Sequence, residues 1–245
     1  MDITLLIAAV FVGAVLQRVS GIGFAMVVAP FTIIAIGPAQ GIVLVQICGV
    51  SSAVLVFTQV FRHVDWRAYW GLVPASVIGI AIGAWAAAKL PNAPAQILSA
   101  VTMLFALFAS VVIGRLRQMA RSNSTMAAAG GMAGVMTVLA GVGGVALTAL
   151  QQATRWDHRS FVATLQPYLI TLSTMTVLAR LSASENAWPA LTLEIWLVIA
   201  ASMALGIWLG GRVALWCSSR VAARLTVALS FIGAITAFLD GVSKI

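Results

Sequence analysis

The sequence predicts an all-α polytopic membrane protein built from two related halves. Two observations lead to this prediction: 62% of the 245 residues are hydrophobic while only 8% are charged, and long apolar segments recur along the whole chain. Soluble domains carry about 25% charged residues. A water-soluble fold of this length could not bury so much apolar surface. Lipid must therefore surround much of the chain, and segments of about 20 apolar residues can cross it.

The apolar segments follow the same order twice: one long run broken by glycines, and then three spans. In chain order they are 3–37, 39–61, 68–90, 95–114, 126–154, 159–181, 191–216 and 220–241. Such periodicity indicates an internal repeat. The domains that we expect are a first repeat at 1–114, a basic cytoplasmic linker at 115–125 and a second repeat at 126–245, which together form one integral membrane domain.

Residue identities at a constant spacing support this repeat. SGIGF at 20–24 corresponds to AGVGG at 140–144, an offset of 120 residues, and Gln46 corresponds to Gln166 at the same offset.

Two glycine pairs, Gly79 with Gly83 and Gly206 with Gly210, correspond at an offset of 127. Small residues four apart let two membrane helices approach closely, so we interpret these pairs as packing faces.

Each broken run has two interpretations. As helices, 3–19 and 22–36 would be about 25 and 22 Å long at 1.5 Å per residue, short for a full crossing. They would then form a re-entrant or short helical hairpin, which is tolerated where protein or a cavity surrounds the non-helical backbone. The alternative is one long, kinked and tilted crossing.

Loop charges favour the hairpins, because that arrangement collects the basic loops on one side. The loops placed with the linker in the cytoplasm contain Arg62, Arg67, Arg115, Arg117, Arg121, Arg155, Arg159, Arg212, Arg220 and Arg224. The outer side receives Lys89, Arg180 and Lys244. The positive-inside rule then predicts inverted-topology repeats with both termini outside. The expected location is a bacterial inner membrane.

The two glycine breaks are the leading candidate site. A helix that begins inside the bilayer presents unpaired N–H groups and the positive end of its dipole, which attract anions. Inverted-repeat transporters bind substrate at such paired breaks. The substrate-binding candidates are Ser20, Gly21, Ile22 and Gly23 in the first half and Ala140, Gly141, Val142, Gly143 and Gly144 in the second. Alternatively, the glycines only allow close packing.

Three further side chains are candidates for the same site. Arg18 adjoins the first break and could clasp an oxyanion with its guanidinium, or it could extend to the membrane surface. Gln46 and Gln166 are neutral amides that could donate to an anion without burying a charge. Their alternative role is a hydrogen bond between helices.

Several classes of function are disfavoured by the sequence. The cysteines Cys48 and Cys217 lack the spacing of a metal site, so neither metal nor cofactor is expected. No phosphate-binding loop or nucleophile–base set is evident. The net charge of +8 is scattered through short loops, which suits orientation in a membrane and not nucleic-acid binding. The partners expected are lipid and a small anion; a homo-oligomer stays open.

At the breaks the sequence resembles the sulfite exporter TauE/SafE family, whose two homologous halves each open with a glycine-rich motif followed by proline. SGIGFAMVVAP at 20–30 ends on Pro30, while AGVGGVALTAL at 140–150 has Leu150 in place of the second proline. The resemblance implies export of sulfite, of sulfonates such as sulfoacetate, or of related small organic anions. We therefore expect a secondary transporter and no enzyme; the alternatives are an anion channel and a non-transporting membrane enzyme or assembly factor.

Overall fold

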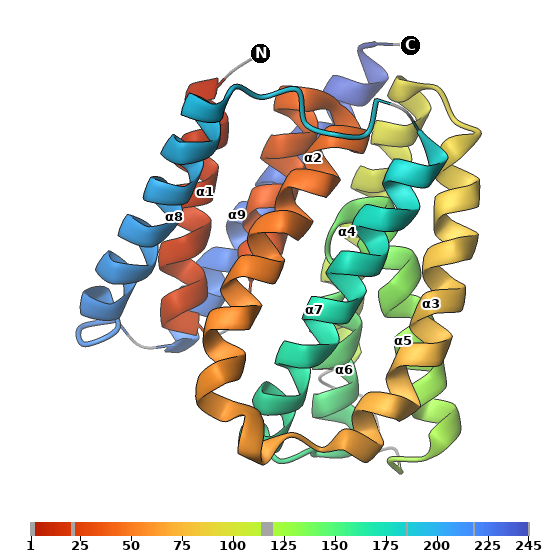
Figure 1. Ribbon diagram of the computed structural model, residues 1–245, viewed down its shortest axis with the longest axis vertical. Coiled ribbons are helices and arrows are strands. Elements are labelled where there is room, and N and C mark those ends of the chain that lie inside the picture. The colour runs from red at the N-terminus through yellow and green to blue at the C-terminus, as the bar shows by residue number, and fades with distance from the viewer. Residues whose placement is uncertain (1–2, 21–22, 114–119, 185, 218, 245) are drawn as a thin grey trace.

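The protein is a bundle of α-helices (Figure 1). The computed structural model describes residues 3–20, 23–113, 120–184, 186–217 and 219–244, and in these ranges it contains helices, one 3-10 turn and no strand. Six of the helices are long and apolar enough to cross a membrane. The chain is thus a polytopic helical membrane protein, as the sequence predicts.

The helices follow each other with short connections. The first half consists of α1 (Ile3–Ser20), α2 (Phe24–Val60), the 3-10 turn η1 (Phe61–His63), α3 (Trp66–Ala88) and α4 (Asn92–Ile113). The second half consists of α5 (Asn123–Ala140), α6 (Gly144–Thr154), α7 (His158–Ala183), α8 (Leu193–Val213) and α9 (Ser219–Val242).

Helix α2 consists of two helices joined at a kink. Gly37 has φ 83° and ψ 165°, and Pro38 follows it. Glycine tolerates positive φ, and proline suits the first turn of the helix that begins after the bend. Residues 24–36 therefore form one short helix of about 20 Å, and residues 38–60 form the following span.

Helix α5 begins inside the segment expected to be a linker. Ser122 caps it: the Ser122 hydroxyl accepts from the Thr125 N–H, and the Thr125 side chain accepts from the Ser122 N–H. This reciprocal pair satisfies two N–H groups that a helix start otherwise leaves unpaired. The cap explains why the helix starts at Asn123, before the continuous apolar run.

The chain reverses direction at both breaks, so each broken run forms a hairpin. A Cβ built on Gly13 would lie 2.5 Å from Val28 Cγ2, whereas 15 residues of continuous helix would separate these positions by about 22 Å. At the second break, a Cβ on Gly143 would lie 2.4 Å from the Ala133 carbonyl oxygen. These contacts contradict one continuous kinked crossing for either run.

The two halves make corresponding contacts. Helix α3 packs on α5 and α8 packs on α1. A Cβ on Gly79 would lie 2.2 Å from Gly131 O, and one on Gly206 would lie 2.7 Å from Phe11 O. The contacted residues are 120 positions apart, and the glycines are 127 apart, which are the offsets found in the sequence. Both glycines are positions where helix backbones touch.

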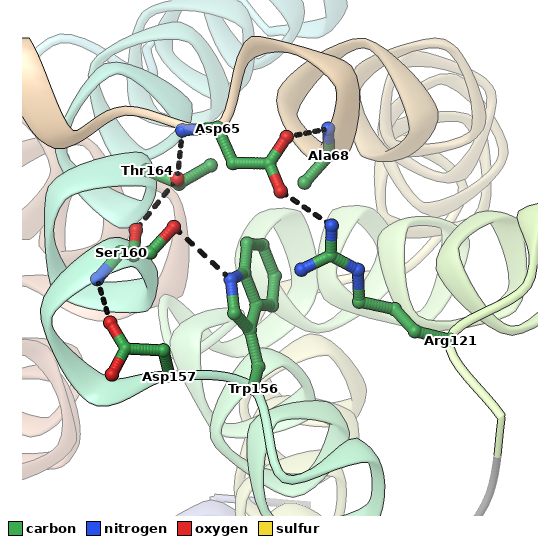
Figure 2. A network of polar contacts seen from close by, with 7 residues as sticks. All are labelled: Asp65, Ala68, Arg121, Trp156, Asp157, Ser160 and Thr164. Atoms are coloured by element: carbon green, nitrogen blue, oxygen red, sulfur yellow. Dashed lines mark hydrogen bonds and ion pairs between the residues drawn. The ribbon is translucent and has the colours of Figure 1, made fainter.

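Three loops meet at the end of the bundle that is lower in Figure 1, and Figure 2 shows their polar contacts. Arg121 forms an ion pair with Asp65 and lies 4.7 Å from the ring centre of Trp156. The Asp65 N–H donates to Thr164 Oγ1 at 2.9 Å. Burial raises the pKa of Asp65, but hydrogen bonds from the Ala68 N–H and Arg121 outweigh it, leaving that pKa below its usual value.

Candidate functional site

A cavity of about 90 Å³ lies where the two breaks meet. Gly23 and Phe24 line it from the first break, and residues 141–144 line it from the second, while α2 and α7 supply most of the remaining wall. Its volume is several times the roughly 10–15 Å³ that one water requires. The candidate residues that line it are Gly23, Gln46, Gly141, Val142, Gly143, Gly144 and Gln166.

Other candidates lie elsewhere. The side chain of Arg18 is exposed and lies against α8, where a Cβ on Gly210 would meet its Cβ at 2.8 Å. Ala140 is fully buried and is not part of the cavity wall. Gly21, Ile22 and the side chain of Ser20 lie outside the described residues.

The glycines of the breaks differ in the backbone angle and in the space available for a side chain. Gly23 and Gly141 have φ of 124° and 78°, values that disfavour any residue with a Cβ. Gly143 has an ordinary helical φ of −59°, but a Cβ there would lie 1.8 Å from Thr137 Oγ1. Gly144 differs from all three, because a Cβ there would meet nothing within 4 Å.

Two helices begin at the cavity with uncapped N-termini. Helix α2 starts after Gly23 and α6 after Gly143, and neither N-cap makes a side-chain hydrogen bond in the described part of the chain. At α6 the Val145 and Ala146 N–H groups donate to the carbonyl oxygens of Val142 and Gly143 at 3.2 Å, while the helix dipole places partial positive charge at both N-termini. This combination makes the cavity receptive to negative charge.

Gln46 connects the two halves across the cavity. Its Nε2 donates to the Gly141 carbonyl oxygen at 3.2 Å, and its Oε1 accepts from Ser173 Oγ at 2.6 Å. Gln166, in the corresponding position of the second half, donates instead to Val162 O of its own helix at 3.0 Å. The repeat pattern in the sequence indicates both amides but not Ser173. Ser173 lies seven residues after Gln166, two turns along the same helix face, and that spacing could have revealed it.

The cavity also has polar lining residues that are not among the candidates predicted from the sequence. Gln17 Nε2 donates to Ser52 Oγ at 3.0 Å, and Thr137 Oγ1 donates to Ala133 O at 2.6 Å. Among the described residues, every polar side chain of the wall is a neutral amide or hydroxyl. No group of three or more His, Cys, Asp or Glu that could hold a metal occurs in the described ranges. The hydroxyls of Thr137 and Ser173 already donate their single hydrogen within the protein, so the site offers a ligand amide N–H groups and helix dipoles.

Arg180 is a buried cation near the second break. Its side chain is in the last turn of α7, and its Nε donates to Val138 O at 2.9 Å, a bond shared by its Nη2. The described residues form no ion pair with it. The sequence predicts an outer-loop charge at Arg180, because this residue falls near the end of an apolar run. The structure gives it another role: it satisfies a carbonyl in the last turn of α5.

A second, apolar cavity of about 310 Å³ lies between α4, α5 and α6. Ala106 and Leu150 are in its wall, and Val145 of α6 contributes to both cavities. The corresponding place in the first half is tightly packed, since a Cβ on Gly233 would lie 2.7 Å from Pro30 Cγ. Leu150 stands 120 residues after Pro30, so the two hairpins differ at this contact.

Comparison with known proteins agrees with the membrane fold. The family described as "Sulfite exporter TauE/SafE" matches residues 5–237. The "Probable inner membrane transporter protein TsaS" of Comamonas testosteroni is 27% identical over 154 residues, which cover 63% of this chain and 64% of that relative. The chain thus spans a little under two thirds of this relative's length. No solved structure matches. Because the family match extends over nearly the whole sequence, the chain belongs to the sulfite exporter TauE/SafE family.

Proposed function

We propose that the protein is a secondary transporter that exports small anions, sulfite or an organosulfonate such as sulfoacetate, across a bacterial inner membrane. The observation that carries this proposal is the single cavity shared by both glycine breaks. Family membership and the resemblance to a probable inner membrane transporter support it. Neither observation favours an enzyme.

The chemistry of the cavity suits reversible binding of an anion. Two helix N-termini supply partial positive charge, and the neutral amides, which carry two N–H donors each, supply hydrogen bonds. A fixed positive charge would bind an anion more tightly but would also slow its release. A neutral site can bind and release within one transport cycle, and an inside-negative potential favours anion exit by about 2.3 kcal/mol per charge per 100 mV.

Two repeats of inverted topology, 1–114 and 126–245, would supply the alternating movement. Helices α1 and α5 are offset by 120 residues at both ends, and in Figure 1 α1 begins at the upper end of the bundle while α5 begins at the lower end. In such transporters one repeat moves against the other around a fixed site.

The orientation in the membrane follows from the loop charges. Helix α1 begins and α9 ends at the upper end of Figure 1. The loops with Arg62, Arg121 and Arg155 belong to the opposite end, where three loops meet. The positive-inside rule places that arginine-rich end in the cytoplasm and both termini outside.

A reconstituted flux assay tests the function. Purified protein in liposomes, with an imposed potential, should move sulfite or sulfoacetate with saturable flux that anion on the far side stimulates. Gly144→Trp should abolish flux, because Gly144 lines the cavity and has open space for a side chain. Ile78→Trp is the matched control, since Ile78 is 62% exposed on α3.

Two results would favour the alternatives. An ohmic single-channel current would show an anion channel, in which the breaks form a filter. A folded, reconstituted protein that moves none of the tested anions would favour a non-transporting membrane enzyme or assembly factor.

A further inference from the structure

The side-chain amide of Gln46 is held from two sides by the other half of the chain. The Gly141 carbonyl oxygen can only accept a hydrogen bond, so the amide nitrogen must face it, as the 3.2 Å contact shows. The amide oxygen then faces Ser173, whose hydroxyl must donate at 2.6 Å. Chemistry therefore fixes the orientation of the amide, because the reverse orientation would bring two oxygens together at Gly141.

This arrangement determines which group Gln46 can offer to a ligand. A carboxamide nitrogen carries two N–H donors, and Gly141 uses one of them. The amide oxygen already accepts from Ser173. Gln46 lines the cavity, so the donor that remains is its second N–H. Both Gln46 and Ser173 are buried, at 4% and 3% exposure, which limits competition from bulk water.

We propose that Ser173 is a positioning residue: the Gly141 carbonyl oxygen sets which way the Gln46 amide faces, and the Ser173 hydroxyl occupies the amide oxygen, so that Gln46 presents only an N–H to the transported anion. The inference rests on the proposed function and narrows its substrate class. The site selects oxyanions whose oxygens only accept hydrogen bonds, such as a sulfonate or fully deprotonated sulfite. It discriminates against molecules of similar shape that carry N–H or O–H donors, because those need an acceptor that the held amide does not offer.

Gln166, the glutamine of the second half, has no corresponding hydroxyl partner among the described residues of the first half. The position that corresponds to Ser173 at the 120-residue offset is Ala53, which lines the cavity without a hydroxyl. Gln166 donates to Val162 O of its own helix. The selectivity therefore depends on one amide, Gln46, and on one hydroxyl that holds it.

A pair of variants with the same shape tests this role. Ser173→Thr keeps the hydroxyl and Ser173→Val replaces it with a methyl group, while both add the same bulk to the cavity wall. Sulfite flux into proteoliposomes is measured with methanesulfonate and methanesulfonamide as competitors. Ser51→Ala is the control, because Ser51 is exposed and its hydroxyl bonds Ile47 O in its own helix.

The expected result separates positioning from structure. The wild type, Ser173→Thr and Ser51→Ala should be inhibited far better by methanesulfonate than by methanesulfonamide. Ser173→Val should raise the half-saturating sulfite concentration about tenfold, the effect of one lost hydrogen bond to a charged group. Its preference for methanesulfonate should fall by a similar factor, while its maximal flux stays close to that of Ser173→Thr.

Other results would overturn the inference in distinguishable ways. If the wild type transports sulfite and Ser173→Val keeps the full preference for methanesulfonate, the positioning role is wrong and the transporter stands. If both Ser173 variants lose maximal flux with unchanged preference, the serine is only structural. A wild type that moves no tested anion would refute the proposed function, and the inference would fall with it.

Discussion

The neighbouring glycines Gly143 and Gly144 give a sharp test of how the second break is packed. An alanine Cβ at Gly143 would lie 1.8 Å from Thr137 Oγ1 and 2.4 Å from Ala133 O. The backbone carbonyl cannot rotate away, and overpacking of this kind costs about 1–3 kcal/mol. Turning Thr137 aside would also lose its 2.6 Å bond to Ala133 O, which contributes about 1 kcal/mol. Gly143→Ala should therefore lower the unfolding free energy by about 2–4 kcal/mol.

Gly144→Ala is the matched control, because its Cβ would meet nothing within 4 Å. Replacing glycine with alanine at a compatible position stabilises by about 0.4–1 kcal/mol. Denaturant titration in detergent micelles, followed by the fluorescence of the eight tryptophans, measures both variants. Gly143 also has a helical backbone, so strain at positive φ does not confuse the comparison. Equal stability of the two variants would refute the packing argument.

Three other perturbations have expected results. Asp65 has a lowered pKa in the fold, so its contribution to stability is complete above its unfolded pKa of about 3.9 and is lost as pH falls through the lower folded pKa. Asp65→Asn should therefore flatten the loss of stability below about pH 4, and Arg121→Gln should do so in part. Thermal unfolding measured across pH checks both variants. Gly79→Ala should destabilise the α3–α5 contact by about 1–3 kcal/mol, whereas Gly131→Ala, with its nearest contact at 3.7 Å, should not; melting curves of the pair decide this. Arg180→Met should cost about 1–3 kcal/mol by leaving a buried α5 carbonyl unpaired, and Arg180→Lys should cost less in the same denaturant titration.

The membrane fold and the position of the breaks could be predicted from the sequence, because both depend on local patterns. Apolar segment length and composition identify the helices, and glycine clusters mark where they are interrupted. Gly143 and Gln46 can be proposed as site candidates from such patterns. The amide attracted notice because an equivalent glutamine recurs 120 residues later.

Long-range contacts explain what could not be predicted. Ser173 looks like any serine in a membrane helix until α2 and α7 are brought together, when its hydroxyl meets Gln46 at 2.6 Å. The sequence alone suggests a loop charge at Arg180, because its partner, Val138, is 42 residues away. Arg18 adjoins the first break in sequence, but its side chain is directed to α8, because a helix places neighbouring residues on different faces.

The apolar cavity beside α6 makes the two hairpins mechanically unequal. Helix α6 is only 11 residues long, and it borders the shared cavity through Val145 and the apolar cavity along Val145, Ala146 and Leu150. The first part of α2 instead packs closely on α9 where Pro30 contacts Gly233. Elements with few packed neighbours open at lower free energy than the rest of a fold. A force or a bound anion acting on both hairpins would thus displace the second one first, so that a transporter built from two similar halves would be driven mainly by one.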